Sequence, residues 1–151
     1  CGTLTGMPQQ TVRFEQFFAA PRERVFAWFA DHEKFGRIWP GRTRRLHESA
    51  DASEPNGLGS VREVRTAGLS FEETITVFEP PAHIEYRITK GGPIKNHRGD
   101  LRFAAVEGGT KLDYTIEFDP KVPLTGGLIA SIMCTSWHRG VQRAVEDLAS
   151  G

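Results

Sequence analysis

Glu73 and His97 are the two side chains best suited to acid–base chemistry. Each lies in a segment where hydrophobic and polar residues alternate, and each falls on the hydrophobic side of that alternation. A carboxylate or an imidazole among apolar neighbours has a shifted proton affinity and can act as a general acid or base. Glu73 and His97 are therefore the candidate catalytic residues, should the protein be an enzyme.

Both side chains also have a structural explanation. Glu73 could form an ion pair with a nearby arginine such as Arg65, and His97 could be a core histidine with satisfied hydrogen bonds. A one-residue bulge in either strand would turn the side chain outward. The sequence leaves these alternatives open, and with them whether the protein is an enzyme.

Further polar side chains share these hydrophobic faces. Gln16, for example, lies between Phe14 and Phe18 in an alternating segment. Polar groups that converge in an apolar concavity are typical of a small-molecule site. The residues expected to orient a ligand are Gln16, Glu73, Tyr86, His97 and Tyr114.

Large apolar side chains would form the mouth and the floor of such a site. Aromatic residues at helical spacing are also typical of a plain core, so a filled interior is the alternative. The large residues expected to contact a ligand are Phe35, Trp39, Phe71, Phe103, Met133 and Trp137.

The elements that must position these residues follow from hydrophobic periodicity and turn signals. Residues 124–149 carry apolar side chains at three- and four-residue steps, which predicts one long amphipathic helix. Pro21 begins an expected helix over 21–30, and a second over 32–38 ends before Pro40. Alternation between turn signals predicts strands at 11–19, 44–50, 60–66, 69–79, 82–89, 96–106 and 110–118.

Consecutive strands joined by short turns form an antiparallel sheet, and a sheet of seven twisted strands curls. A lone long helix needs an apolar surface, and the concave side of that sheet supplies one. We therefore expect an α+β fold: a seven-stranded curved antiparallel sheet around a long C-terminal helix, with two short helices after the first strand. At 151 residues the chain fits one domain, covering 1–151.

Composition and motif spacing exclude several function classes. Nineteen acidic and nineteen basic residues balance, so no net field favours nucleic acid, and no apolar run approaches the roughly 20 residues of a transmembrane helix. The five histidines show no paired metal-ligand spacing, and neither a nucleophile elbow nor a complete nucleotide-binding motif occurs. We expect no metal and no cofactor. Four arginines near the second helix either form a solvated face or attract an acidic ligand head group: Arg37, Arg42, Arg44 and Arg45.

The two cysteines, Cys1 and Cys134, are too few for a disulfide framework. Cys134 lies in the long helix, where we expect a reduced, buried thiol. Cys1 is either a lipidated or a trimmed N-terminus. The sequence favours a cytoplasmic protein, present as a monomer or a homodimer.

The chain resembles the START-like (SRPBCC) superfamily, and best its polyketide cyclase/dehydrase branch. The resemblance rests on APRERVF (20–26), WPG (39–41), GLGSVR (57–62), FEPPAHIEY (78–86) and GTKL (109–112). It implies a helix-grip fold that holds a hydrophobic small molecule between the curved sheet and the last helix. The superfamily includes lipid carriers, hormone receptors, pollen allergens and polyketide aromatase/cyclases, which share no invariant catalytic triad.

The residues and the resemblance together favour binding of a hydrophobic or aromatic small molecule, lipid-like or polyketide-like, between the sheet and the C-terminal helix. Apolar burial would supply the affinity. One alternative is an aromatase/cyclase-type enzyme that folds a polyketide-like chain while Glu73 or His97 moves protons. Another is a co-chaperone-like interaction module with a filled core and an apolar outer patch, for which Phe17 and Phe78 are expected to face outward.

Overall fold

The structure, a computed structural model, describes residues 2–5 and 9–150. Its strands are β1 (Gly2–Thr5), β2 (Gln10–Phe18), β3 (Arg42–His47), β4 (Val61–Thr66), β5 (Leu69–Glu79), β6 (His83–Gly91), β7 (Ile94–Val106) and β8 (Gly109–Pro120). Its helices are α1 (Arg22–Ala30), α2 (His32–Gly36) and α3 (Gly126–Ala149). Cys1, the residue expected to be lipidated or trimmed, lies outside the described residues.

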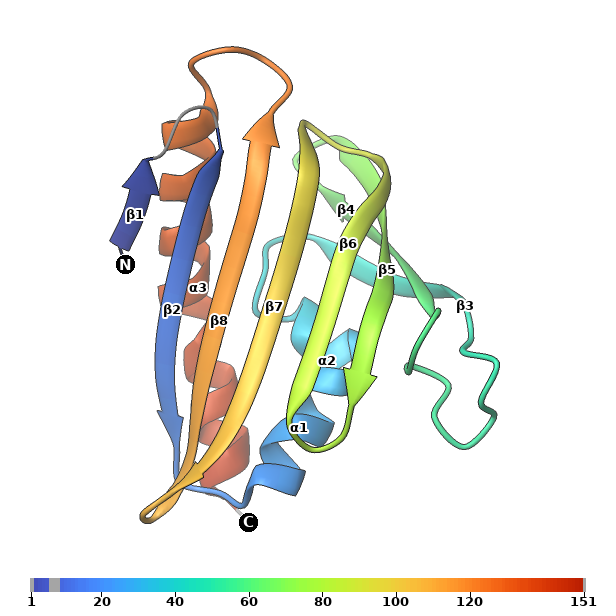
Figure 1. Cartoon of the computed structure of the whole chain (residues 1–151), viewed down its shortest axis with the longest axis vertical. Helices are drawn as coiled ribbons and strands as arrows, with labels where there is room; N and C mark the ends of the chain where they lie inside the picture. Colours follow the sequence, from blue (N-terminus) through green and yellow to red (C-terminus); the bar gives the residue numbers. More distant parts are fainter. Residues whose placement is uncertain (1, 6–8, 151) are drawn as a thin grey trace.

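All the strands form one antiparallel sheet in the order β1-β2-β8-β7-β6-β5-β4-β3. Figure 1 shows the three helices on one side of this sheet, with α3 running behind β2 and β8. The expected α+β helix-grip fold is confirmed, with the predicted strands corresponding to β2–β8. The additional strand, β1, pairs with β2 at the edge of the sheet.

The long helix α3 is anchored by Trp137 near its middle. The indole ring stacks on Phe14 of β2, with 4.8 Å between ring centroids, and lies edge-on to Tyr114 of β8 at 5.2 Å. One turn further along, Gly140 lies against the backbone of Ile38, where an added Cβ would come within 1.9 Å of the carbonyl oxygen. The absence of a side chain at Gly140 therefore lets α3 pack directly on the segment that follows α2.

A bulge in β5 changes which side chains face the core. The register between β5 and β6 shifts between Ile75 and Val77, so the alternation of faces reverses there. Phe78 consequently packs on the ring of Phe26, with 5.4 Å between centroids. The prediction that Phe78 faces outward is therefore wrong, whereas Phe17 is 49% exposed.

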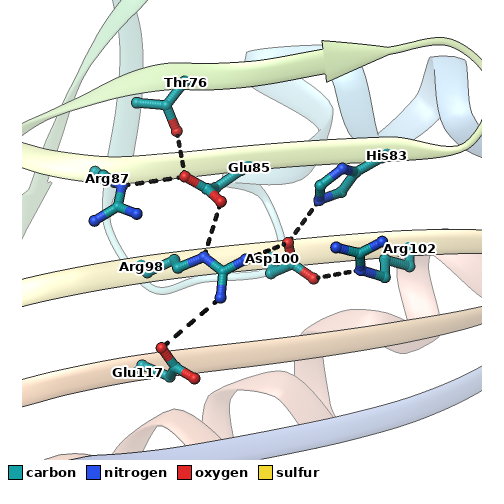
Figure 2. Close-up of polar contacts among 8 residues, drawn as sticks. All are labelled: Thr76, His83, Glu85, Arg87, Arg98, Asp100, Arg102 and Glu117. Atoms are coloured by element: carbon teal, nitrogen blue, oxygen red, sulfur yellow. Dashed lines mark hydrogen bonds and ion pairs between the residues drawn. The ribbon is translucent and has the colours of Figure 1, made fainter.

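The face of the sheet away from the helices carries a network of ion pairs across neighbouring strands (Figure 2). Arg98 of β7 is its centre: its Nε donates to Glu85 of β6 at 2.8 Å and its Nη2 to Asp100 at 3.2 Å. Burial alone would raise the pKa of Glu85, but hydrogen bonds from Arg98, Thr76 and Arg87 together lower that pKa to about 2. Glu85 therefore stays ionised although it is buried.

No helix among the described residues is long and apolar enough to cross a membrane. Cys134 is half-buried and disulfide-bonded, so the expectation of a reduced, buried thiol is wrong. A disulfide gives no support to a cytoplasmic location, because cytosolic thiols are kept reduced.

Candidate ligand-binding site

A cavity of about 470 Å³ lies between the concave face of the sheet, α2 and the N-terminal half of α3. Its walls are mostly apolar. Strands β4–β8 contribute one side, and the opposite side comes from α2, the segment after it and α3. The described residues that line it include Phe35, Trp39, Arg62, Val64, Phe71, Glu73, Tyr86, Ile88, His97, Ile116, Ile129 and Met133.

The cavity opens at one end between the β4–β5 turn and the first turns of α3. Leu69, Leu128 and Ile132 line it there, and all three side chains are exposed. Exposed apolar side chains at the mouth of an apolar cavity give a hydrophobic ligand a path from solvent to the interior. Sequence periodicity alone placed none of these three residues at an entrance.

Arg62 and Glu73 form a buried ion pair on the cavity wall. They are direct partners in the antiparallel pairing of β4 with β5, and Arg62 Nε donates to Glu73 Oε1 at 2.8 Å. Both side chains point into the concave side, where Arg62 is 2% exposed. The expected partner, Arg65, lies instead on the outer face and pairs with Glu63 at 3.0 Å.

Two aromatic rings hold the Arg62 guanidinium. Its central carbon lies 4.9 Å from the ring centroid of Phe35 and 4.6 Å from that of Tyr86. Both distances are within the range of cation–π attraction. The flat guanidinium is thus fixed by contacts with its faces as well as by its hydrogen bonds.

His32 supports Arg62 from behind the cavity wall. Because a guanidinium can only donate, Arg62 Nη1 donates to His32 Nδ1 at 3.2 Å, and His32 Nε2 then donates to Ser60 Oγ at 3.1 Å. Burial, followed by the nearby charges of Arg62 and Arg45, lowers the pKa of His32 to about 3. His32 is therefore neutral at physiological pH and acts as a positioning residue for Arg62.

His97 presents a hydrogen-bond donor to the cavity. The backbone N–H of Ile88 donates to His97 Nδ1 at 3.0 Å, so the proton of the neutral ring is on Nε2. Burial is the main cause that lowers the pKa of His97 to about 4; Arg62 also lowers it, and Glu73 opposes the shift. A neutral ring with an N–H is the form present at neutral pH.

Tyr86 and Tyr114 are joined through their hydroxyl groups. Burial raises the pKa of both phenols, so both remain protonated. Gly99, opposite Tyr86 in β7, makes room for the Tyr86 ring, because a Cβ at Gly99 would lie 2.3 Å from ring atoms of Tyr86. This space lets Tyr86 extend across β7 toward Tyr114 in β8.

The structure brings together most of the residues expected to contact a ligand. Those that line the cavity are Phe35, Trp39, Phe71, Glu73, Tyr86, His97 and Met133. Tyr114 does not line the cavity itself but is hydrogen-bonded to Tyr86, which does. Phe103 and Trp137 are buried in the aromatic core. Gln16 is half-buried away from the cavity, and its side-chain nitrogen donates to the Phe17 carbonyl at 3.0 Å. None of these last four residues is part of the cavity lining. For the three strand residues, the reason is that alternation identifies the face of a strand and not the position along it. Trp137 lies in α3, where its ring stacks on Phe14 in the core.

Arg62, His32 and Ser60 were missed by sequence reasoning. In β4 the two valines, Val61 and Val64, lie on opposite faces, so hydrophobic alternation does not identify the inner one. The usable signal was Glu73 itself, since a buried carboxylate needs a compensating partner, and a neighbouring strand can supply one. Among the described residues, no cluster of three or more His, Cys, Asp or Glu side chains could hold a metal ion.

Comparisons with known proteins agree with this fold. A START superfamily protein from Mycobacterium smegmatis superposes with a TM-score of 0.73 and 16% identity over 91% of this chain and 98% of that chain. A protein from Thermus thermophilus gives 0.71 and 19% over 93% and 99%, and the Aha1 dimer from Colwellia psychrerythraea gives 0.66 and 15% over 93% and 97%. No protein of curated function matches the chain. The family described as polyketide cyclase / dehydrase and lipid transport matches residues 9–150, and the chain belongs to this family, as the START-like resemblance predicted.

Proposed function

We propose that the protein binds a hydrophobic or aromatic small molecule, lipid-like or polyketide-like, in the cavity between the sheet and α3. The observation that carries the proposal is the cavity itself. Its volume of about 470 Å³ falls in the range of about 300–1,000 Å³ typical of small-molecule sites. Its mostly apolar walls favour a hydrophobic occupant, and each 100 Å² of apolar ligand surface buried there would contribute about 2.5 kcal/mol.

An aromatase/cyclase-type enzyme is the second candidate, because Glu73 and His97 line one cavity. Neither group is well placed for this role. Glu73 is committed to the ion pair with Arg62, and the pKa of His97 is lowered to about 4, far from the neutral value that suits proton transfer. The geometry therefore supports binding more strongly than proton transfer.

A co-chaperone-like interaction module has less support. That hypothesis predicts a filled core and an apolar outer patch. The cavity argues against a filled core, and Phe78 packs inward on Phe26 instead of contributing to an outer patch.

Native mass spectrometry of gently purified protein, with a denatured extract beside it, tests the proposal. A co-purifying small molecule of apolar character is the expected result. A matched pair of variants in β4 tests where it binds. Val64→Phe adds volume inside the cavity, whereas Val61→Phe adds the same volume on the opposite face of the same strand.

We expect Val64→Phe to lose the bound molecule, and Val61→Phe to retain it. Thermal shifts across a panel of apolar ligands should follow the same pattern. Protein that carries no molecule, with no thermal shift from any apolar ligand, would contradict the proposal.

A further inference from the structure

Three polar side chains meet in the cavity without using all of their hydrogen-bonding capacity. Arg62 Nη2 is buried and has no hydrogen-bond partner among the described residues. His97 lines the cavity with its Nε2–H, because its Nδ1 is occupied by the Ile88 N–H. Glu73 accepts from Arg62 through Oε1, which leaves Oε2 as a potential acceptor. The cavity thus offers donors from Arg62 and His97 and an acceptor from Glu73.

The charges of this polar group cancel. Arg62 and Glu73 are the charged residues of the cavity lining, and they neutralise each other at 2.8 Å. His97 and the two tyrosine hydroxyls are neutral at physiological pH. A ligand carboxylate would meet the like charge of Glu73 and would find the charge of Arg62 already paired.

We propose that the cavity selects uncharged hydrophobic molecules that bear a hydroxyl, phenol or carbonyl group over carboxylates of the same size. The ligand oxygen accepts from Arg62 Nη2 or from His97 Nε2, and a ligand hydroxyl can in addition donate to Glu73. This inference rests on the proposed function and adds the chemical class of the ligand.

The reason for selection is the unpaired N–H of Arg62 Nη2. A buried guanidinium N–H without a partner is costly, and a neutral oxygen satisfies it without bringing a second charge into a low-dielectric interior. An alkane as long as such a ligand fills the apolar volume of the cavity but leaves the N–H of Arg62 Nη2 unpaired. A carboxylate pairs with the donor but must itself be desolvated next to Glu73.

The test uses a series of ligands with one chain and different head groups: dodecanol, 2-dodecanone, dodecane and dodecanoate. Displacement of the neutral fluorophore N-phenyl-1-naphthylamine at neutral pH gives each relative affinity. With the wild-type chain we expect the alcohol and the ketone to bind about tenfold tighter than either dodecane or dodecanoate, which corresponds to one well-satisfied hydrogen bond.

Glu73→Gln sharpens the test, because it removes the negative charge and keeps a hydrogen-bond acceptor for Arg62. The positive charge of Arg62 is then unpaired, so the order should reverse in favour of dodecanoate. Ile132→Ala at the exposed mouth is the control: it should weaken binding of all four ligands and leave their order unchanged.

The outcomes separate this inference from the proposed function. Failure of every ligand to displace the fluorophore, or of the fluorophore to bind, would count against the cavity as a binding site. Binding in which dodecane equals dodecanol, or in which dodecanoate is tightest to the wild-type chain, would overturn the selectivity and leave the binding function standing. The wild-type order decides this even if Glu73→Gln does not fold.

Discussion

Arg62 and Glu73 lie directly opposite each other in β4 and β5, and their side chains form an ion pair inside the molecule at 2.8 Å. The pair also connects β4 and β5 to α2 and β6, because Arg62 contacts Phe35 of α2 and Tyr86 of β6. A charge held in this position serves as a fixed polar point in a mostly apolar wall. The contribution of this ion pair to the stability of the fold can be measured separately from its role in ligand binding.

Removing one member of this pair should destabilise the fold strongly. Glu73→Leu leaves the buried Arg62 charge uncompensated, and such single changes typically cost about 3–5 kcal/mol. The double variant Arg62→Met with Glu73→Leu removes both charges and should lose much less stability. Urea unfolding of the two variants measures the difference. Equal losses for both would show that the ion pair is not the source of the effect.

The space at Gly99 should be essential for the position of Tyr86. Gly99→Ala places a methyl group 2.3 Å from Tyr86 ring atoms, which must move, and overpacking of this kind typically costs about 1–3 kcal/mol. Because Tyr86 lines the cavity, ligand affinity should fall as well. Gly127→Ala is the control, since nothing lies within 4 Å of its added Cβ. It should leave stability unchanged or slightly raised. A Gly99→Ala protein as stable as this control would contradict the expected clash.

The architecture could be predicted from the sequence because alternation is strong in the long strands. β5 was expected at 69–79 and spans Leu69–Glu79. The side of Glu73 followed from the same alternation, because β5 pairs with β4 in continuous register from Leu69 to Thr74. β1 could not be predicted, because four residues give too little pattern to separate a strand from a loop.

The composition of the site was harder to predict for a physical reason. A β-bulge leaves no signal in composition, so the inward turn of Phe78 became visible only in the β5–β6 register. Arg62 was missed because a buried arginine looks like a solvent-facing residue until its carboxylate partner is identified. Gln16 shows the opposite error, since it shares a face with buried phenylalanines but lies away from the cavity.

His97 should make stability decrease as the solution becomes moderately acidic. Its pKa falls from 6.5 to about 4 on folding, so between these values the unfolded chain binds a proton that the folded chain does not. The free energy of unfolding therefore falls as pH decreases through this window, by up to about 1.4 kcal/mol per pH unit for one proton. His97→Gln should reduce that slope in urea titrations.

His32 contributes a similar dependence, because its pKa is lowered from 6.5 to about 3, so the slope of the His97→Gln variant should be smaller but not zero. The exposed residue His47 supplies the control, and His47→Gln should reproduce the wild-type slope. A His97→Gln curve that overlays the wild type would mean that His97 is not held neutral by the fold.

Glu85, which accepts a hydrogen bond from Arg98 in the outer network of Figure 2, should govern stability at lower pH. Its pKa is lowered from 4.5 to about 2, chiefly through hydrogen bonds from Arg98, Thr76 and Arg87 that outweigh the effect of burial. A depressed carboxyl pKa contributes stability that is complete above about pH 4.5 and is lost as pH falls toward 2.

Glu85→Gln should therefore be less stable than the wild-type chain at neutral pH, with the difference shrinking as pH falls through this window. Glu107→Gln, in the exposed β7–β8 turn, should keep the wild-type pH dependence. A constant difference between Glu85→Gln and the wild type from neutral pH down to about pH 2 would show that the carboxylate charge of Glu85 is not what the arginines stabilise.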